Sequence, residues 1–88
     1  MFILILVTDV EVTSKNCTPG IRVRRGSDWK WENADYHNGK PGLGNITDCN
    51  PAIGNLWAMV KWDNGQKYQY RIGDNGTYEL YLANEPRK

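Results

Sequence analysis

The stretch Arg25-Gly26-Ser27-Asp28-Trp29-Lys30-Trp31 places two tryptophans two residues apart, shortly after an Arg-Gly pair. Residues i and i+2 of a strand share one face, so Trp29 and Trp31 can be buried together or form one exposed platform. Tryptophan brings a large apolar area and one N–H group that needs an acceptor, which suits a small core as well as a binding surface. The function of this chain therefore depends largely on which of these two places the rings occupy.

Apolar and polar residues alternate on both sides of this stretch, which indicates short β-strands. The segment 56–62 has one face that runs from Leu56 to Trp62, and Asn64-Gly65 after it is a strong hairpin signal because both residues tolerate positive φ. In the return strand, Tyr68 and Tyr70 share a face, and we expect both to fill the core. The five expected strands are 21–25, 43–47, 56–62, 67–72 and 77–83, with a polar loop over 32–44.

No segment shows a sustained helical period, and glycine-rich turns separate the expected strands. Five short strands in 88 residues predict an all-β fold, a small closed or half-open barrel. An SH3-like β-barrel is the first choice, and an OB-type barrel is the second. The chain is long enough for one domain only.

The charge balance argues against a nucleic-acid partner. Eleven basic residues stand against ten acidic ones, whereas a nucleic-acid binder usually has a strongly basic face. The apolar run Met1–Val7 is far shorter than the roughly 20 residues needed to span a bilayer, and it lacks the basic start and cleavage site of a secretory signal. We expect 2–12 to be an extra strand or an apolar flank, and we predict no membrane partner.

Cys17 and Cys49 leave the redox environment open. In a secreted domain the two could pair, whereas a cytosolic module carries free thiols as small buried hydrophobes. Three Asn-x-Thr sequons, at Asn16, Asn45 and Asn75, carry information only in the secretory pathway. We expect a cytoplasmic location, with secretion as the alternative.

The residues that carry out catalysis or hold metals are sparse. His37 is the single histidine and lies in the polar loop, where a solvated side chain is the simplest interpretation. Two distant cysteines and one histidine do not form a zinc-binding pattern, and no glycine-rich phosphate loop precedes a helix. We therefore predict no cofactor, no metal and no enzymatic activity for this chain by itself.

Several short motifs resemble, in the same order, those of the Mind bomb/HERC domain. They are Gly20–Trp31, Gly42–Ile46, Val60–Gly65, Tyr70–Gly73 and Gly76–Leu80. The Arg-Gly-x-Asp-Trp-x-Trp element is the specific one, and the resemblance covers about residues 20–83. It implies an SH3-like barrel that occurs as a module in large ubiquitin ligases, where such domains bind short peptides of substrate proteins while separate RING or HECT domains transfer ubiquitin.

The sequence departs from the family pattern after Trp31. The run Ala34–Lys40 replaces a Gln-Asp-Gly-Gly-like run, and Glu79 stands where Asp is usual. A peptide that fits other family members is therefore not assured of fitting here. We divide the chain into a flank of unknown role at 1–19, the domain at 20–83 and a frayed tail at 84–88.

Face assignment suggests a binding surface. Trp57 should point outward beside Lys61, and aromatic residues next to arginines dominate binding hot spots. The predicted peptide-binding residues are Trp29, Tyr36, Trp57 and Arg71, with Arg24 at the rim. In the structural alternative, Trp31, Trp62 and Asp28 serve the fold, and Arg25 or Arg71 pairs with Asp28 or Asp63.

The sequence thus predicts a non-catalytic, monomeric module that recognises a short peptide of a protein substrate in a ubiquitin-ligase context. One alternative is a structural domain that packs against neighbouring domains without its own ligand. A secreted carbohydrate- or protein-binding domain is the other, and an oxidised Cys17–Cys49 bond would favour it.

Overall fold

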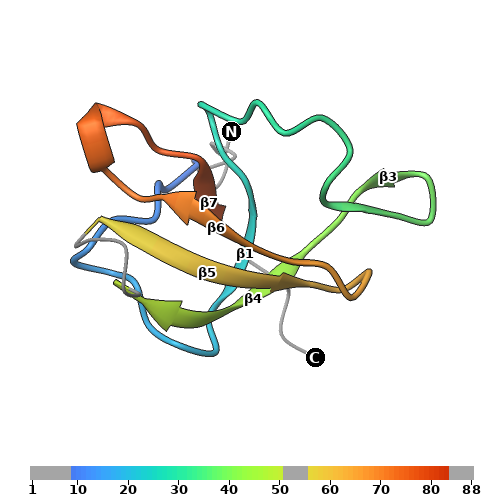
Figure 1. Cartoon of the computed structure of the whole chain (residues 1–88), viewed down its shortest axis with the longest axis horizontal. Coiled ribbons are helices and arrows are strands. Elements are labelled where there is room, and N and C mark those ends of the chain that lie inside the picture. Colours follow the sequence, from blue (N-terminus) through green and yellow to red (C-terminus); the bar gives the residue numbers. More distant parts are fainter. Residues whose placement is uncertain (1–8, 51–55, 84–88) are drawn as a thin grey trace, which may run out of the picture.

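Five antiparallel strands form one sheet, and a small hairpin projects from it (Figure 1). The computed structural model describes residues 9–50 and 56–83. The strands are β1 (Arg22–Arg25), β2 (Tyr36–His37), β3 (Lys40–Pro41), β4 (Gly44–Cys49), β5 (Trp57–Trp62), β6 (Lys67–Arg71) and β7 (Leu80–Leu82). The sheet order is β6-β5-β4-β1-β7, and β2 pairs with β3 in the projecting hairpin. A short 3-10 turn, η1 (Asp74–Gly76), connects β6 to β7.

The all-β prediction is confirmed, and the five expected strands correspond to the five strands of the sheet. The barrel is not closed, because no ladder within the described residues joins the edge strands β6 and β7. A single bridge, Ile72 with Tyr78, and a 3.0 Å hydrogen bond from Glu79 N–H to the Arg71 carbonyl hold these edges together at one end only. The expected loop over 32–44 contains the short β2–β3 hairpin.

The β5–β6 turn is longer than the Asn64-Gly65 signal suggests. The Gly65 N–H donates to the Trp62 carbonyl at 2.9 Å, and the Trp62 N–H donates to the Gln66 carbonyl at 2.8 Å, so three residues form the loop. Gly65 alone of these three has a positive φ, +94°. Asn64 instead donates through its side chain to the carbonyls of Ala34 and Tyr36, at 3.1 and 2.8 Å. This turn therefore also fastens the loop that precedes β2.

The core lies inside the curve of the sheet. Its buried members are Val12, Val23, Ile46, Ala58, Val60, Trp62, Tyr70, Ile72 and Leu80. The interior position predicted for Tyr68 is wrong, because its side chain is 44% exposed. Tyr68 shares a face with Tyr70, as expected, but β6 ends the sheet, and the part of the face near the hairpin turn is not covered.

The segment before β1 packs along β7. Val12 is fully buried; its N–H donates to the Leu80 carbonyl at 3.0 Å, and the Leu82 N–H donates to the Val10 carbonyl at 2.8 Å. Glu11 forms a bridge with Tyr81. Residues 10–12 thus extend the sheet beyond β7, while residues 1–8 of the expected apolar flank lie outside the described residues.

Cys17 and Cys49 form a disulfide with a Cα–Cα distance of 6.1 Å, which resolves the pairing that the sequence left open. The bond joins the N-terminal segment to the end of β4. In the described part of the chain there is no helix with the length and apolarity to cross a membrane.

Candidate functional site

The Arg-Gly-x-Asp element fastens the end of β1 to the segment before β7. A Cβ atom at Gly26 would lie 2.5 Å from the Leu80 nitrogen, so only glycine permits this approach. The Asp28 N–H donates to the Tyr78 carbonyl at 3.0 Å, and the Asp28 carboxylate accepts the Tyr78 N–H at 2.7 Å. Gly26 and Asp28 therefore serve the fold, although the Asp28 carboxylate accepts from Tyr78, 50 residues away, and not from the local N–H groups of a turn that the structural interpretation predicted.

An ion pair between the partly exposed Arg25 and the buried Asp35 supports the loop that carries Trp29 and Trp31. Arg25 donates through Nε to Asp35 Oδ2 at 2.9 Å and through its terminal nitrogen to Asp35 Oδ1 at 2.7 Å. The Asp35 carboxylate is fully buried, and its hydrogen bonds raise the pKa of Arg25. A third bond from Arg25 reaches the Glu32 carbonyl at 3.0 Å. Breaking this pair would leave the buried Asp35 carboxylate without a compensating charge, which is costly. The pair therefore holds residues 32–35 against β1.

Arginine partners for aspartates differ from those predicted. Arg25 pairs with Asp35, Arg22 with Asp63 at 2.8 Å, and Arg71 approaches Asp74 at 3.7 Å. Asp28 takes part in backbone hydrogen bonds instead. The predicted pairing was wrong because the loop after Trp31 turns back onto β1 and brings Asp35 to Arg25. The alternation of residues along a strand does not predict the path of a loop.

Aromatic rings connect the tryptophan loop to the core. Trp29 stacks on Tyr70 with a centroid distance of 5.3 Å and meets Trp62 edge-on at 5.6 Å. The Trp62 indole N–H donates to the Tyr70 hydroxyl at 2.8 Å. Burial of the phenol raises the pKa of Tyr70 to about 12, and nearby Asp35 and Glu79 act in the same direction. Trp29 and Tyr70 thus form a rigid base under the loop.

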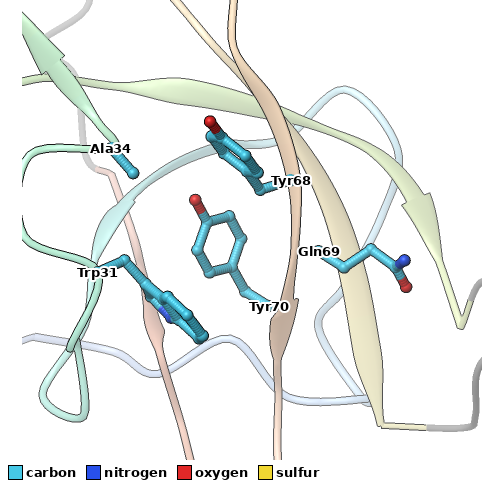
Figure 2. Close-up of a pocket in the computed structure, with 5 residues that line it drawn as sticks. All are labelled: Trp31, Ala34, Tyr68, Gln69 and Tyr70. Carbon is cyan, nitrogen blue, oxygen red and sulfur yellow. The ribbon is translucent and has the colours of Figure 1, made fainter.

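Trp31 and Tyr68 stand above this base and face a groove (Figure 2). The groove has a volume of about 390 Å³ and is lined by Trp31, Ala34, Tyr68, Gln69 and Tyr70. Trp31 and Ala34 come from the loop before β2, while the other three belong to β6. Trp31 and Tyr68 are each 44% exposed, so the burial expected for Trp31 in the structural interpretation is wrong. Tyr70, which is buried, lies between them.

The five predicted binding residues fall into three groups. Arg71 lies over the Trp57 ring at 5.4 Å, and both side chains are partly exposed on β5 and β6. Arg25 lies over Trp29 at 5.1 Å. Tyr36 belongs with Trp29, because its ring centroid lies 5.8 Å from the same Arg25 guanidinium. Arg24 forms the third group: it lies over the Tyr81 ring at 4.8 Å and pairs with Asp9. Trp29 adjoins the groove through its stacking on Tyr70.

Sequence reasoning missed the two exposed groove residues, Trp31 and Tyr68. The structural interpretation of Trp31 assumed that a small domain needs its large rings inside, and face assignment placed Tyr68 in the core with Tyr70. A signal was available in the sequence, because Tyr68 lies only three residues after Gly65 of the Asn64-Gly65 turn. In the structure its hydroxyl donates to the Gln66 side chain at 2.9 Å. Side chains close to a hairpin turn often extend past the covered part of the sheet.

The groove offers aromatic surface and backbone groups but few groups for chemistry. Within the described residues, no three His, Cys, Asp or Glu side chains are grouped so that they could hold a metal ion. The Tyr68 and Tyr70 hydroxyls are polar groups among its lining residues, and Gln69 lines it with its side chain directed away from the rings. The lining of the groove is thus mainly aromatic.

The fold and this groove define a small all-β module with an aromatic surface groove. The Mib_herc2 family model matches residues 20–84, and the chain belongs to this family.

Three of the proteins similar to this chain are E3 ubiquitin-protein ligases. The chain is 40% identical over 78 residues to the E3 ubiquitin-protein ligase mind-bomb of Drosophila melanogaster, covering 88% of this chain and 6% of that protein. It is 44% identical over 71 residues to the E3 ubiquitin-protein ligase HERC2 of Homo sapiens, covering 76% and 1%. For the E3 ubiquitin-protein ligase Ufd4 of Drosophila melanogaster the identity is 45% over 69 residues, covering 78% and 2%. The chain thus corresponds to a small part of each of these proteins.

Proposed function

We propose that this chain is a non-catalytic peptide-recognition module of a ubiquitin-ligase type protein, and that the groove between Trp31 and Tyr68 holds the peptide. The observation that carries the proposal is the exposure of these two large rings, 44% each, on opposite walls of one groove. Exposed aromatic pairs of this kind are typical of surfaces that bind a partner.

The loop and the floor of the groove support the proposal because they are preorganised. Trp31 follows Trp29, which is stacked on Tyr70, and the Arg25–Asp35 pair holds the far side of the loop. A preformed site loses little conformational freedom when a ligand binds, so more of the contact free energy appears as affinity.

Family membership supports the cellular context. The three relatives described above are ubiquitin ligases, and this chain matches 6%, 1% and 2% of their lengths. We propose that ubiquitin transfer resides in other parts of such a protein, that this module selects a protein substrate in the cytoplasm, and that the isolated module is a monomer. No cysteine of the described residues lines the groove, and Cys17 and Cys49 are joined to each other in a disulfide.

The Cys17–Cys49 disulfide favours a second candidate, a secreted protein-binding domain. Disulfides persist in oxidising compartments and are rare in the cytosol. This candidate shares the groove but differs in the partner that it meets. The free-thiol content of the protein purified under non-reducing conditions from the cytoplasm and from the medium of expressing cells distinguishes the two locations.

The proposal is tested by selecting a display library of random decapeptides on the folded chain. We expect enriched peptides whose affinity falls at least about tenfold with Trp31→Ala or Tyr68→Ala, since such rings carry hot-spot energies of about 2 kcal/mol. Tyr81→Ala, a partly buried ring paired with Arg24 away from the groove, is the matched control and should retain affinity. Absence of enriched peptides, or equal affinity for all variants, would contradict the proposal.

A further inference from the structure

β6 is an edge strand with a free side next to the groove. Hydrogen bonds from the Ile72 N–H to the Leu56 carbonyl and from the Trp62 N–H to the Gln66 carbonyl, both 2.8 Å, fix the phase of the β5–β6 ladder. Hydrogen-bonded pairs alternate with non-hydrogen-bonded pairs in an antiparallel ladder. The backbone groups of Tyr68 and Tyr70 therefore face β5, and those of alternate residues such as Gln69 face outward.

One outward position is already occupied by the protein itself. The Arg71 N–H donates to the Glu79 carboxylate at 2.8 Å, and the Arg71 carbonyl accepts the Glu79 N–H at 3.0 Å. No corresponding bond reaches Gln69 from any other part of the described chain. The outward N–H and C=O of Gln69 thus form an open pairing site, two residues before the point where Glu79 closes the edge.

The open site lies beside the groove. Figure 2 shows the Gln69 side chain directed away from the Tyr68 and Tyr70 rings, although Gln69 contributes to the groove lining. Trp31 and Ala34 face β6 from the opposite wall. An extended chain inserted between them and β6 would place its backbone against Gln69. Since cross-strand neighbours share a face, its residue beside Tyr68 would direct a side chain toward the aromatic rings.

The charge near this edge is positive. Lys67 lies opposite Lys61 across the β5–β6 ladder, and both side chains are exposed. Among the described residues, no carboxylate lies within 4.0 Å of either ammonium group. Like charges directly opposite each other destabilise a ladder, and a nearby carboxylate relieves this repulsion. The residue of an added strand beside Lys67 would share the face of the two lysines, opposite to the groove.

We propose that β6 accepts an extended peptide as an additional strand, with a large apolar side chain in the aromatic groove and an acidic residue adjacent to it beside Lys67. This inference rests on the proposed peptide-recognition function and specifies how the backbone and the sequence of the peptide are recognised. The Gln69 N–H and carbonyl pair with the peptide backbone, Trp31 and Tyr68 enclose the apolar side chain, and Lys67 with Lys61 selects the acidic neighbour.

The test compares Gln69→Pro with Gln69→Ala in binding a decapeptide enriched on the unmodified chain. Proline removes the outward N–H but none of the hydrogen bonds to β5, and edge strands tolerate it. Alanine keeps the N–H and changes only the side chain that points away from the groove. We expect affinity to fall at least about tenfold with Gln69→Pro and less than about threefold with Gln69→Ala. Lys67→Glu should reverse the preference for acidic peptides.

The outcomes separate the two proposals. If Trp31→Ala abolishes binding while Gln69→Pro and Gln69→Ala bind alike, strand addition is wrong and the peptide-recognition function stands. If no peptide is enriched, both proposals fail. Should Gln69→Pro not fold, methylation of successive backbone nitrogens of the peptide replaces it. Loss of binding at every second position supports strand addition, and a uniform response overturns it.

Discussion

At the residue scale, Gly26 explains why the Arg-Gly-x-Asp-Trp-x-Trp element needs its glycine. The backbone of residues 79 and 80 passes so close that a Cβ would lie 2.5 Å from the Leu80 nitrogen and 2.6 Å from the Glu79 carbonyl carbon. The contact is with backbone, which cannot rotate away. Gly26→Ala should therefore lower the free energy of unfolding by about 3 kcal/mol, because the cost of overpacking adds to the cost of displacing the backbone. Chemical denaturation measures this, and Ser27→Ala, at an exposed neighbour, should change it by less than about 0.5 kcal/mol. Equal effects of the two changes would contradict the close approach.

Tyr70 gives the domain a dependence on alkaline pH. Its folded pKa is raised to about 12 from an ordinary value of 10.0, chiefly by burial. A raised pKa means that the stabilisation is fully present below pH 10 and is lost as pH rises through about 12, because the unfolded state releases the proton first. The free energy of unfolding should fall by about 3 kcal/mol more over this range in the unmodified chain than in Tyr70→Phe.

The matched control for this titration is Tyr68→Phe, which removes an exposed phenol. It should keep the alkaline loss, whereas Tyr70→Phe should reduce it. Tyr70→Phe also removes the acceptor of the Trp62 indole N–H, so its stability at neutral pH should be lower by about 1 kcal/mol. An alkaline slope that persists in Tyr70→Phe would show that another group causes it.

At the scale of elements, the β5–β6 turn has two functions. Gly65 takes the left-handed conformation that closes the hairpin, and Asn64 fastens the loop at Ala34 and Tyr36. Gly65→Val should lower the free energy of unfolding by about 2 kcal/mol, because a β-branched residue is strained at φ +94°. A thermal melt measures this, and Gly65→Asn should recover part of the loss because asparagine tolerates positive φ. An unchanged melting temperature for Gly65→Val would count against the turn.

The elements show how far the sequence could specify the fold and the site. Alternation located all five strands of the sheet within a few residues, because each strand has one buried face. The same alternation placed Tyr68 with Tyr70 but could not reveal that β6 is an edge, and so assigned Tyr68 to the core. The role of Trp31 depends on the Arg25–Asp35 pair, which joins residues ten apart through a loop without periodicity. Trp57 and Arg71 do lie together, and their role in binding remains a prediction.

At the scale of the whole molecule, the Cys17–Cys49 disulfide closes a loop with a sequence separation of 32. The closed segment includes β1, the residues between β1 and β2 that carry Trp29 and Trp31, and most of β4. Loop-closure entropy predicts a loss of about 3 to 4 kcal/mol in the free energy of unfolding on reduction, less any structure retained by the reduced unfolded chain. Denaturation with and without a reductant measures the effect, and Cys17→Ala/Cys49→Ala should behave like the reduced chain. A stability that does not respond to the reductant, with thiol counting confirming reduction, would contradict the structural role.

At the same scale, two partly exposed aromatic surfaces of the described residues can be compared as places for peptide binding. The groove has Trp31 and Tyr68 as walls on the free edge of the sheet, while Trp57 and Arg71 pair with each other on the adjacent strands. Both surfaces have a cation over a tryptophan ring, Lys30 over Trp31 at 5.6 Å and Arg71 over Trp57 at 5.4 Å, but Trp31 and Tyr68 are each 44% exposed, whereas Trp57 is only partly exposed. We therefore expect peptide binding to depend more on Trp31 and Tyr68 than on Trp57 and Arg71.

The most direct test of this claim is a ¹H–¹⁵N NMR titration of the folded chain with a decapeptide enriched on it. The account predicts that shifts concentrate on the Trp31 indole N–H and on the backbone amides of Tyr68 and Gln69, and that the Gln69 amide becomes protected from exchange. Shifts concentrated on Trp57 and Arg71, with the Gln69 amide unchanged, would contradict it.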